Sequence, residues 1–282
     1  MHSFAILTAV ATFILLIAGG LVTSTDSGLA VPDWPLSYGT VFPPMVGGIV
    51  YEHTHRVIAA TVGLLIAVLA VWAHRSGAPR AVRRLSLVAA AGVVLQGVLG
   101  GLTVLLVLPP PMSITHACLG QLVWCAVLAL ALWTSPSWPA RQAVDSPGLR
   151  GQLIILTAAC FGQLVLGAVI RHSGRALMWH MTGALLLPAL AGALWHRLRR
   201  QPRRHPLLLR CCAGLLIGLI VQILLGVLTV IQGQPVLVTT AHVVLGAGLL
   251  GLSWTMTLLA WPAQASQPAV WPAVRPAAVP AP

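Results

Sequence analysis

Eight stretches of about 20 mostly apolar residues follow one another along the chain, and each is long enough to cross a membrane as a helix. Charged residues make up only 7% of the sequence and hydrophobic residues 58%, so a water-facing surface could not be covered. We therefore predict an all-α polytopic membrane protein. Its eight transmembrane helices are expected at residues 4–23, 55–73, 85–108, 113–133, 151–170, 176–196, 207–231 and 236–260.

All sixteen basic residues are arginine, and their positions predict the direction in which the helices cross. Cytoplasmic loops carry an excess of basic residues. Three arginines, Arg56, Arg171 and Arg175, fall on one predicted side. The other side has thirteen: Arg75, Arg80, Arg83, Arg84, Arg141, Arg150, Arg197, Arg199, Arg200, Arg203, Arg204, Arg210 and Arg275. The sequence thus predicts a multi-pass protein of the cell inner membrane with both termini cytoplasmic.

The net charge of +12 could also indicate a nucleic-acid partner. Arginines in short loops beside membrane spans are better explained as topology signals, so we expect contact with membrane lipid and no nucleic acid. The first stretch could be a cleaved signal peptide, but it lacks a basic n-region and is long for an h-region, so we interpret it as the first helix. The Pro-rich residues 263–282 are expected to form a disordered tail.

The two halves of the chain repeat. The pattern Gln-x-x-x-Gly at 96–100 precedes His116 with the same spacing as the pattern at 222–226 precedes His242. A third copy lies at 163–167. Four spans per half give both halves the same orientation, so we predict two parallel four-helix bundles related by internal pseudo-twofold symmetry. The N-terminal half is expected at residues 1–137 and the C-terminal half at 138–262.

Each Gln-x-x-x-Gly pattern places an amide and a glycine on one helix face, one turn apart. Close helix packing with an interhelical hydrogen bond is the interpretation we favour for the glycines. The alternative is that Gln96, Gln163 or Gln222 donates to the edge of a flat cofactor that the glycine admits.

Four histidines, His55, His116, His180 and His242, lie at or near the starts of the even-numbered predicted helices. One histidine in a membrane helix can simply hydrogen-bond a neighbouring helix, but four at matched positions indicate binding sites. In each half two imidazoles can face each other, which suits a haem iron. Zinc usually takes three or four protein ligands, and no thiolate or carboxylate accompanies the second pair.

Only the first half has charged residues beside its histidine. Glu52 lies three residues before His55 and Arg56 lies one residue after it, whereas Leu177 and Met181 occupy the corresponding places around His180. Glu52 is one of only four acidic residues in the chain, so we favour a chemical role. The alternative is a carboxylate that stabilises a helix N-terminus, with Arg56 paired locally or with a lipid headgroup.

The segment Glu52-His53-Thr54-His55-Arg56 resembles the Glu-x-x-His-Arg signature of the heme A synthase family, and residues 27–36 are similar to the first outer loop of that family. The resemblance covers nearly the whole predicted membrane domain. It implies oxidation of a ring methyl of heme O to a formyl group, with water as the oxygen source. His55 and His116 would hold the substrate haem, while His180 and His242 would ligate haem b, which passes electrons.

The resemblance further implies that Glu52 is a catalytic acid or base, or stabilises positive charge, and that Arg56 orients it or meets a propionate. The expected partners are a heme O synthase that delivers the substrate and an electron acceptor, and a homo-oligomer is compatible with this interpretation. The histidine ends of the helices would face the outer side of the membrane.

The chain departs from the family in one place, because Val31 and Ser37 occupy what look like the positions of a cysteine pair in the outer loop. Packing, with Trp34 and Tyr38 at the interface, is therefore expected to order this loop. Two other functions fit two bis-histidine haems: a transmembrane electron carrier, and a haem transporter or chaperone. The placement of all four histidines at one membrane face argues against the carrier.

Overall fold

The chain forms eight α-helices within the residues that the computed structural model describes, namely 1–138, 144, 146–201 and 205–261. The predicted tail and four arginines used to orient the helices, Arg141, Arg203, Arg204 and Arg275, lie outside the described residues. The helices are α1 (His2–Ser24), α2 (Gly48–Arg75), α3 (Arg80–Leu105), α4 (Pro110–Trp133), α5 (Pro147–Ser173), α6 (Leu177–Arg199), α7 (Pro206–Ile231) and α8 (Val236–Ala260).

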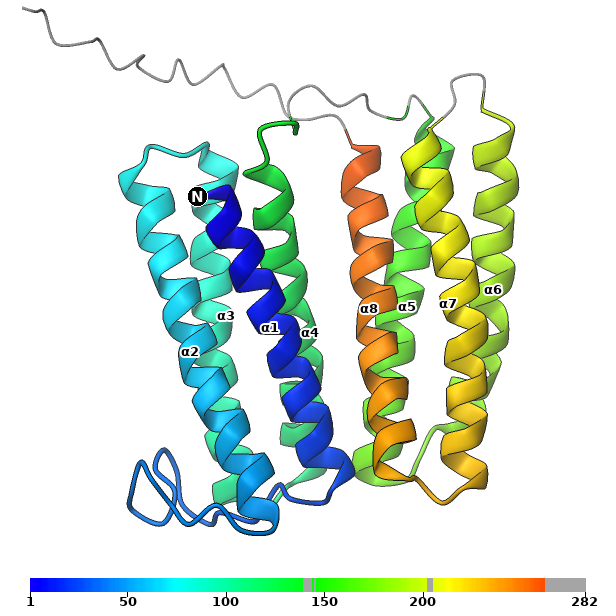
Figure 1. Ribbon diagram of the computed structural model, residues 1–282. Helices are drawn as coiled ribbons and strands as arrows, with labels where there is room; N and C mark the ends of the chain where they lie inside the picture. The colour runs from blue at the N-terminus through cyan, green and yellow to red at the C-terminus, as the bar shows by residue number, and fades with distance from the viewer. Residues whose placement is uncertain (139–143, 145, 202–204, 262–282) are drawn as a thin grey trace, which may run out of the picture.

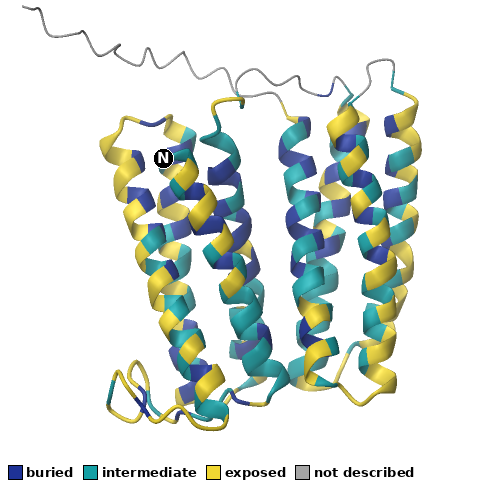
Figure 2. Ribbon diagram, in the orientation of Figure 1, coloured by how far each residue is buried: buried dark blue, intermediate teal, exposed yellow. Residues whose placement is uncertain are grey.

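Each of these eight helices is long and apolar enough to cross a membrane, so the protein is a multi-pass membrane protein. Exposed residues lie along the flanks of the helices (Figure 2). Large apolar side chains are among them, for example Leu64, Leu185 and Ile217. Buried side chains lie between the helices. This distribution is expected where lipid, and not water, surrounds the helices.

The helices divide into two groups that lie side by side (Figure 1). In the first group α1 and α3 each contact both α2 and α4, and in the second α5 and α7 each contact both α6 and α8. Each group encloses its own apolar core, with Ile66 and Leu130 in the first and Leu156 and Leu194 in the second. The pseudo-twofold relation between the groups stays a prediction.

The seam between the groups is formed by α1, α4, α5 and α8, and two tryptophans cross it. The Trp124 indole of α4 donates to the Ala9 carbonyl of α1 over 3.2 Å, and its ring lies so close to α8 that a Cβ on Gly251 would approach it to 2.3 Å. Trp254 of α8 donates to the Cys125 carbonyl of α4 over 2.9 Å. The indoles therefore supply both packing and hydrogen bonds at this seam.

The predicted spans agree with the helices except at a few ends. α2 begins at Gly48 and not at residue 55, so His55 lies about two turns inside the helix. α5 continues to Ser173, which puts Arg171 and His172 in its last turn and not in a loop. α3 ends at Leu105, before residues 107 and 108 adopt positive φ angles of 60° and 56°.

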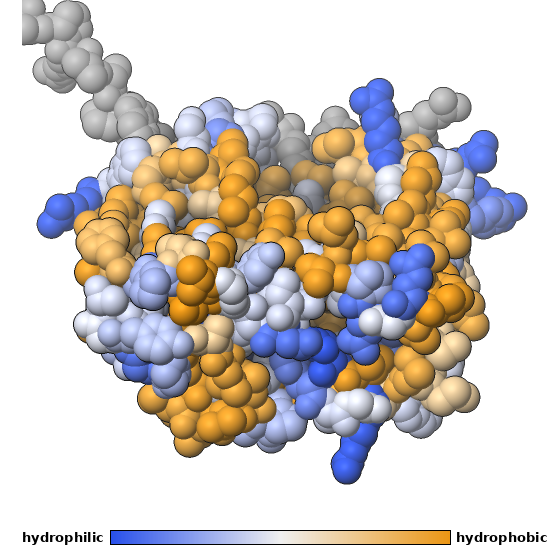
Figure 3. Space-filling view, turned by 60° about the horizontal axis from the view of Figure 1, so that its bottom comes forward, coloured by the Kyte–Doolittle hydropathy of each residue, from blue (hydrophilic) through white to orange (hydrophobic). Residues whose placement is uncertain are grey.

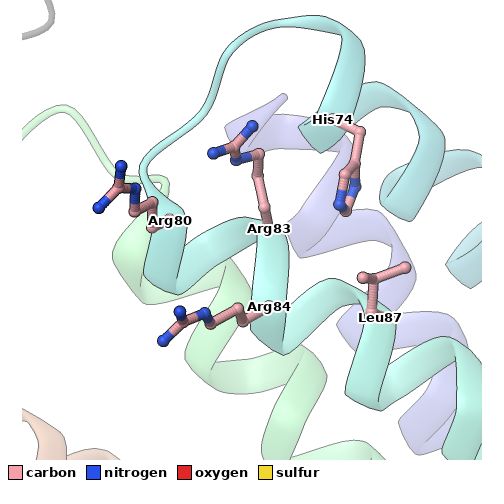
Figure 4. Close-up of a pocket in the computed structure, with 5 residues that line it drawn as sticks. All are labelled: His74, Arg80, Arg83, Arg84 and Leu87. Carbon is pink, nitrogen blue, oxygen red and sulfur yellow. The ribbon is translucent and has the colours of Figure 1, made fainter.

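The two ends of the molecule carry different chemistry. The end at which α2, α4, α6 and α8 begin is called here the histidine end, and the opposite end, with the 76–79 connection, is the arginine end. Met1 and the end of α8 both lie at the arginine end (Figure 1). There His74, Arg80, Arg83, Arg84 and Leu87 line an open pocket, in which the arginine side chains point away from the apolar Leu87 (Figure 4).

Candidate functional site

In the second half, α6 and α8 bring two histidines together in an edge-on arrangement. The ring centres of His180 and His242 are 6.2 Å apart and their planes are inclined by 65°. A metal ion held between two imidazoles by bonds of about 2 Å places the ring centres about 6 Å apart, so this spacing fits one ion with a nitrogen from each side. His242 also has its Nδ1 3.1 Å from the Gln222 carbonyl of α7.

In the first half, His55 of α2 and His116 of α4 are close enough to interact electrostatically. The Nδ1 atoms of both rings are buried without a hydrogen-bond partner within the described residues, and the same is true of His180. A buried and unsatisfied imidazole nitrogen is uncommon unless a ligand completes its environment. The described residues hold no group of three or more His, Cys, Asp or Glu side chains suited to a metal ion. The donor set therefore fits bis-histidine ligation of a haem iron better than a zinc site.

Every one of these four rings lies against a glycine on the preceding helix. A Cβ added to Gly19 of α1 or to Gly100 of α3 would lie 3.2 Å from the Cε1 atom of His55 or His116, respectively. The corresponding distances are 3.4 Å for Gly167 facing His180 and 2.9 Å for Gly226 facing His242. A side chain at Gly19, Gly100 or Gly226 would thus push against the imidazole edge, whereas one at Gly167 would only reach contact with His180.

Glu52 is buried in the first turns of α2, with 3% of its surface exposed. Its Oε1 accepts a hydrogen bond from Arg56 in an ion pair of 2.6 Å, and its Oε2 accepts one from the Val31 backbone N–H over 2.8 Å. The local pairing of Arg56 that the sequence left open as an alternative is therefore present. Both carboxylate oxygens are engaged, so Glu52 fastens the loop between α1 and α2 to the start of α2. It also places a carboxylate three residues before His55.

Arg56 is the main anchor of the loop that joins α1 to α2, residues 25–47 (the α1–α2 loop). Its guanidinium donates to the backbone carbonyls of Asp33 (2.7 Å), Leu36 (2.6 Å) and Val31 (3.2 Å), besides its bond to Glu52. One guanidinium thus satisfies three loop carbonyls at once. The sequence did not reveal this role, because backbone acceptors leave no trace in a residue pattern.

Val31 and Ser37 occupy what look like the positions of a cysteine pair in the family that the sequence resembles, and both are buried and hydrogen-bonded to residues of α2. Val31 bonds Glu52 and Arg56 through its backbone, and the Ser37 hydroxyl lies 2.8 Å from His53 Nδ1. All five cysteines of the chain are within the described residues and are free. The loop is ordered without a disulfide, as predicted, and polar contacts to the start of α2 hold it in addition to the packing of Trp34.

A carboxylate also stabilises the exposed tip of the α1–α2 loop. Asp33 accepts hydrogen bonds from the backbone N–H groups of Gly39 and Tyr38, which hold its pKa below the ordinary value for an aspartate. A lowered pKa in the folded state means that the stability from this contact is fully present above the ordinary carboxyl pKa and is lost as the pH falls through the lowered pKa. The Tyr38 hydroxyl donates to the Ala30 carbonyl, so this predicted aromatic contact does contribute.

Trp34 fastens the α1–α2 loop to α3. A Cβ added to Gly101 would lie 2.7 Å from Trp34 Cδ2, next to the Gly100 that faces His116. The loop therefore reaches across the first half at the histidine end. Around this end the surface alternates between apolar and hydrophilic areas (Figure 3), and the loop exposes large apolar side chains, with Phe42 at 90%.

We expect Gly101→Ala to displace Trp34, because overpacking at such a close contact costs about 1–3 kcal/mol. Hydrogen exchange at the Tyr38 and Gly39 amides should become about fivefold faster or more. Gly97→Ala is the matched control on α3, since a Cβ there meets nothing within 4 Å. Unchanged protection in Gly101→Ala would show that Trp34 does not hold the loop.

An arginine at the end of α5 joins the two halves at the histidine end. Arg171 pairs with Asp26, which follows α1, and donates to the Thr23 carbonyl and to the Gln234 side chain. The sequence placed Arg171 after the predicted fifth helix and used it only as one of the three arginines on the outer side. Its partners come from the other half and from the α7–α8 connection, and no spacing in the sequence indicates such long-range pairs.

Together these features define a class: a multi-pass α-helical membrane protein that brings two pairs of histidines together at one end. The sequence profile of the cytochrome oxidase assembly protein family (COX15-CtaA) matches residues 2–47 and 48–186. The chain belongs to this family. The match includes Glu52, His55, His116 and His180, while His242 lies beyond it.

Curated relatives agree with the family. A heme A synthase of Halalkalibacterium halodurans is 29% identical over 183 residues, which cover 62% of this chain and 60% of that protein. One of Symbiobacterium thermophilum is 32% identical over 198 residues, or 64% of each chain. One of Geobacillus kaustophilus is 24% identical over 287 residues, covering 91% of this chain and 90% of the relative. The chain thus spans about 60% of the first of these relatives and nearly the full length of the last.

Proposed function

We propose that this protein is a heme A synthase, which oxidises the ring methyl of heme O to a formyl group. The observation that carries the proposal is the asymmetry between two otherwise similar histidine sites. Both halves bring two histidines together, but among the described residues only the first half has a buried carboxylate near them in sequence, Glu52, three positions before His55. The relatives named above are heme A synthases, which supports the assignment.

The two sites then have different tasks. His55 and His116 hold the iron of heme O in the first half, and His180 and His242 ligate haem b in the second. The α1–α2 loop closes over the first site through Trp34 and limits the access of water. Arg56 keeps this loop in place and orients Glu52.

The reaction R–CH₃ + H₂O → R–CHO releases four electrons and four protons. When bound, haem b supplies an iron that carries electrons one at a time to an acceptor. Glu52 is the described carboxylate closest in sequence to His55, and its negative charge stabilises the positive charge that develops as electrons leave the methyl group. Its place at the histidine end also suits the release of protons on that side.

The arrangement is proposed to lie in the cell inner membrane, with both termini cytoplasmic and the histidine end facing outward. The described arginines agree with this orientation, since Arg80, Arg83 and Arg84 lie at the arginine end. A heme O synthase as the source of substrate and a separate electron acceptor complete the proposal.

Extraction of haem and mass analysis test the proposal directly. The chain is expressed in a bacterium that makes heme O but not heme A, and we expect heme A or its hydroxylated intermediate to appear. Loss of these products in His55→Ala would place the reaction in the first half. If only unmodified haem b were bound while heme O and an electron acceptor are supplied, the protein would be an electron carrier and the proposal would be wrong.

A further inference from the structure

Three of the four histidine-bearing helices are held by a glutamine from the preceding helix. In each case the glutamine Nε2 donates a hydrogen bond to the backbone carbonyl of the histidine. The distances are 2.8 Å from Gln96 to His116, 2.5 Å from Gln163 to His180 and 2.9 Å from Gln222 to His242. The interhelical hydrogen bond that the Gln-x-x-x-Gly pattern predicted is therefore present, and its acceptor is the histidine itself.

A second glycine completes each contact. A Cβ on Gly120 would lie 3.0 Å from Gln96 Nε2, and one on Gly246 would lie 3.1 Å from Gln222 Nε2. On α6 a Cβ on Gly183 would approach Gln163 Oε1 to 2.3 Å. The glutamine and the histidine thus each lie against a glycine of the partner helix. We call this arrangement of glutamine, histidine carbonyl and facing glycine an amide lock.

The α1/α2 pair has no amide lock. Gly19 faces the His55 ring as in the other pairs, but the residue four positions before Gly19 is Leu15, which has no donor. The residue four positions after His55 is Ala59, and not a glycine. Leu15 instead packs against the apolar core of the first half. The helix that carries His55 therefore receives no side-chain amide hydrogen bond from its neighbour at this level.

We propose that Gln96, Gln163 and Gln222 are positioning residues that fix three of the four haem-ligating histidines, and that His55, which lacks the lock, is the ligand that disengages when haem enters or leaves the first half. This inference rests on the proposed haem sites. It assigns different exchange behaviour to the two halves: the second half has a lock on both of its histidines, and the first half has one lock, on His116.

The physical basis is the directionality of the amide bond in a medium without water. Interhelical hydrogen bonds in membranes contribute about 0.6–2 kcal/mol, and they fix both the rotation and the axial position of a helix. Apolar contacts between helices tolerate small shifts, because they are not directional. A shift of α2 relative to α1 therefore breaks no glutamine hydrogen bond at the level of His55, whereas the same shift of α8 relative to α7 breaks the Gln222 bond.

The experiment measures haem exchange. Purified full-length protein is loaded with haem b alone, and transfer to an excess of a haem-scavenging apoprotein is followed by absorption. We expect a fast phase from the first half and a slow phase from the second, and His55→Ala or His242→Ala assigns each phase by removing it.

Two sets of variants then move the phases in opposite directions. Leu15→Gln with Ala59→Gly installs a lock on α1/α2 and should slow the fast phase about three- to tenfold, the effect of one interhelical hydrogen bond. Gln222→Met keeps the length of the side chain but removes the donor, and should accelerate the slow phase by a similar factor. Leu15→Met is the control for a change of volume at Leu15 and should leave the fast phase unchanged.

The outcomes separate this inference from the proposed function. Suppose that neither the installed lock nor Gln222→Met alters the exchange rates by more than about twofold, while the protein still makes heme A. That result would overturn the role of the locks and leave the synthase assignment in place. The expected shifts in a protein that makes no heme A would overturn the synthase assignment and leave the locks in place. If the Leu15 variants fail to assemble, Gln222→Met still decides the inference.

Discussion

Replacing Glu52 with glutamine is expected to lower the formation of heme A about 100-fold or more, the range in which positioned acid, base or charge groups act. The amide oxygen of glutamine can still accept the Val31 N–H, and Arg56 keeps its three loop carbonyls. The α1–α2 loop should therefore stay folded while the negative charge is lost. Rates of product formation, from timed haem extraction, measure the effect.

Glu52→Ala separates the charge from the structural role. Alanine leaves Arg56 without its ion-pair partner and Val31 without its acceptor, and breaking a buried ion pair typically costs about 3–5 kcal/mol. This variant should lose both activity and amide protection in the loop. Asp26→Asn is the control for loss of a charge at the histidine end and should change the rate less than about threefold. Retained activity in Glu52→Gln would leave Glu52 with the loop contacts only.

Replacing His242 with alanine is expected to lower the haem b content of the purified protein about tenfold or more, because even supporting residues around a metal ligand typically contribute 10- to 100-fold in affinity. The pairing of His180 and His242 at 6.2 Å leaves one ligand without its partner in this variant. Absorption spectra of protein from cells that make haem b but no heme O measure the remaining haem.

Two comparisons sharpen the result for His242. His196→Ala changes an exposed histidine far along α6 from His180 and should keep the full haem content. Imidazole added to His242→Ala should restore a six-coordinate spectrum, because the free base fills the space that the side chain left. Full haem retention in His242→Ala without imidazole would mean that this histidine is not a ligand.

The membrane helices were predictable because apolar length alone identifies them, and all eight appear near the expected residues. The start of α2 was missed because its first two turns contain Glu52 and His53, whose polarity lowers the apparent hydropathy before residue 55. These side chains are accommodated since the α1–α2 loop covers them and satisfies them. Apolarity therefore marks the lipid-facing part of a span, and not the whole helix.

The candidate site was predictable only in part. The repeat and its spacing identified the four histidines and the three glutamines, because both types of residue are rare in apolar helices. The acceptors could not be predicted, since Arg56 and Gln222 bond to backbone carbonyls, which every residue has. Nor could the sequence pair Arg171 with Asp26, because they are 145 positions apart and no repeat relates them.

The seam between the halves sets the distance between the two proposed haem sites, over which an electron would have to pass. Trp254 donates across the seam and the Trp124 ring packs against Gly251 on its far side, so the two four-helix groups are joined along α4 and α8 as well as by Arg171 at the histidine end. Electron tunnelling slows steeply with each added ångström between donor and acceptor. These contacts fix the distance between the two sites, and therefore the tunnelling distance for an electron that passes from the first site to the second. If the α1/α2 pair opens to admit a substrate, that distance stays the same.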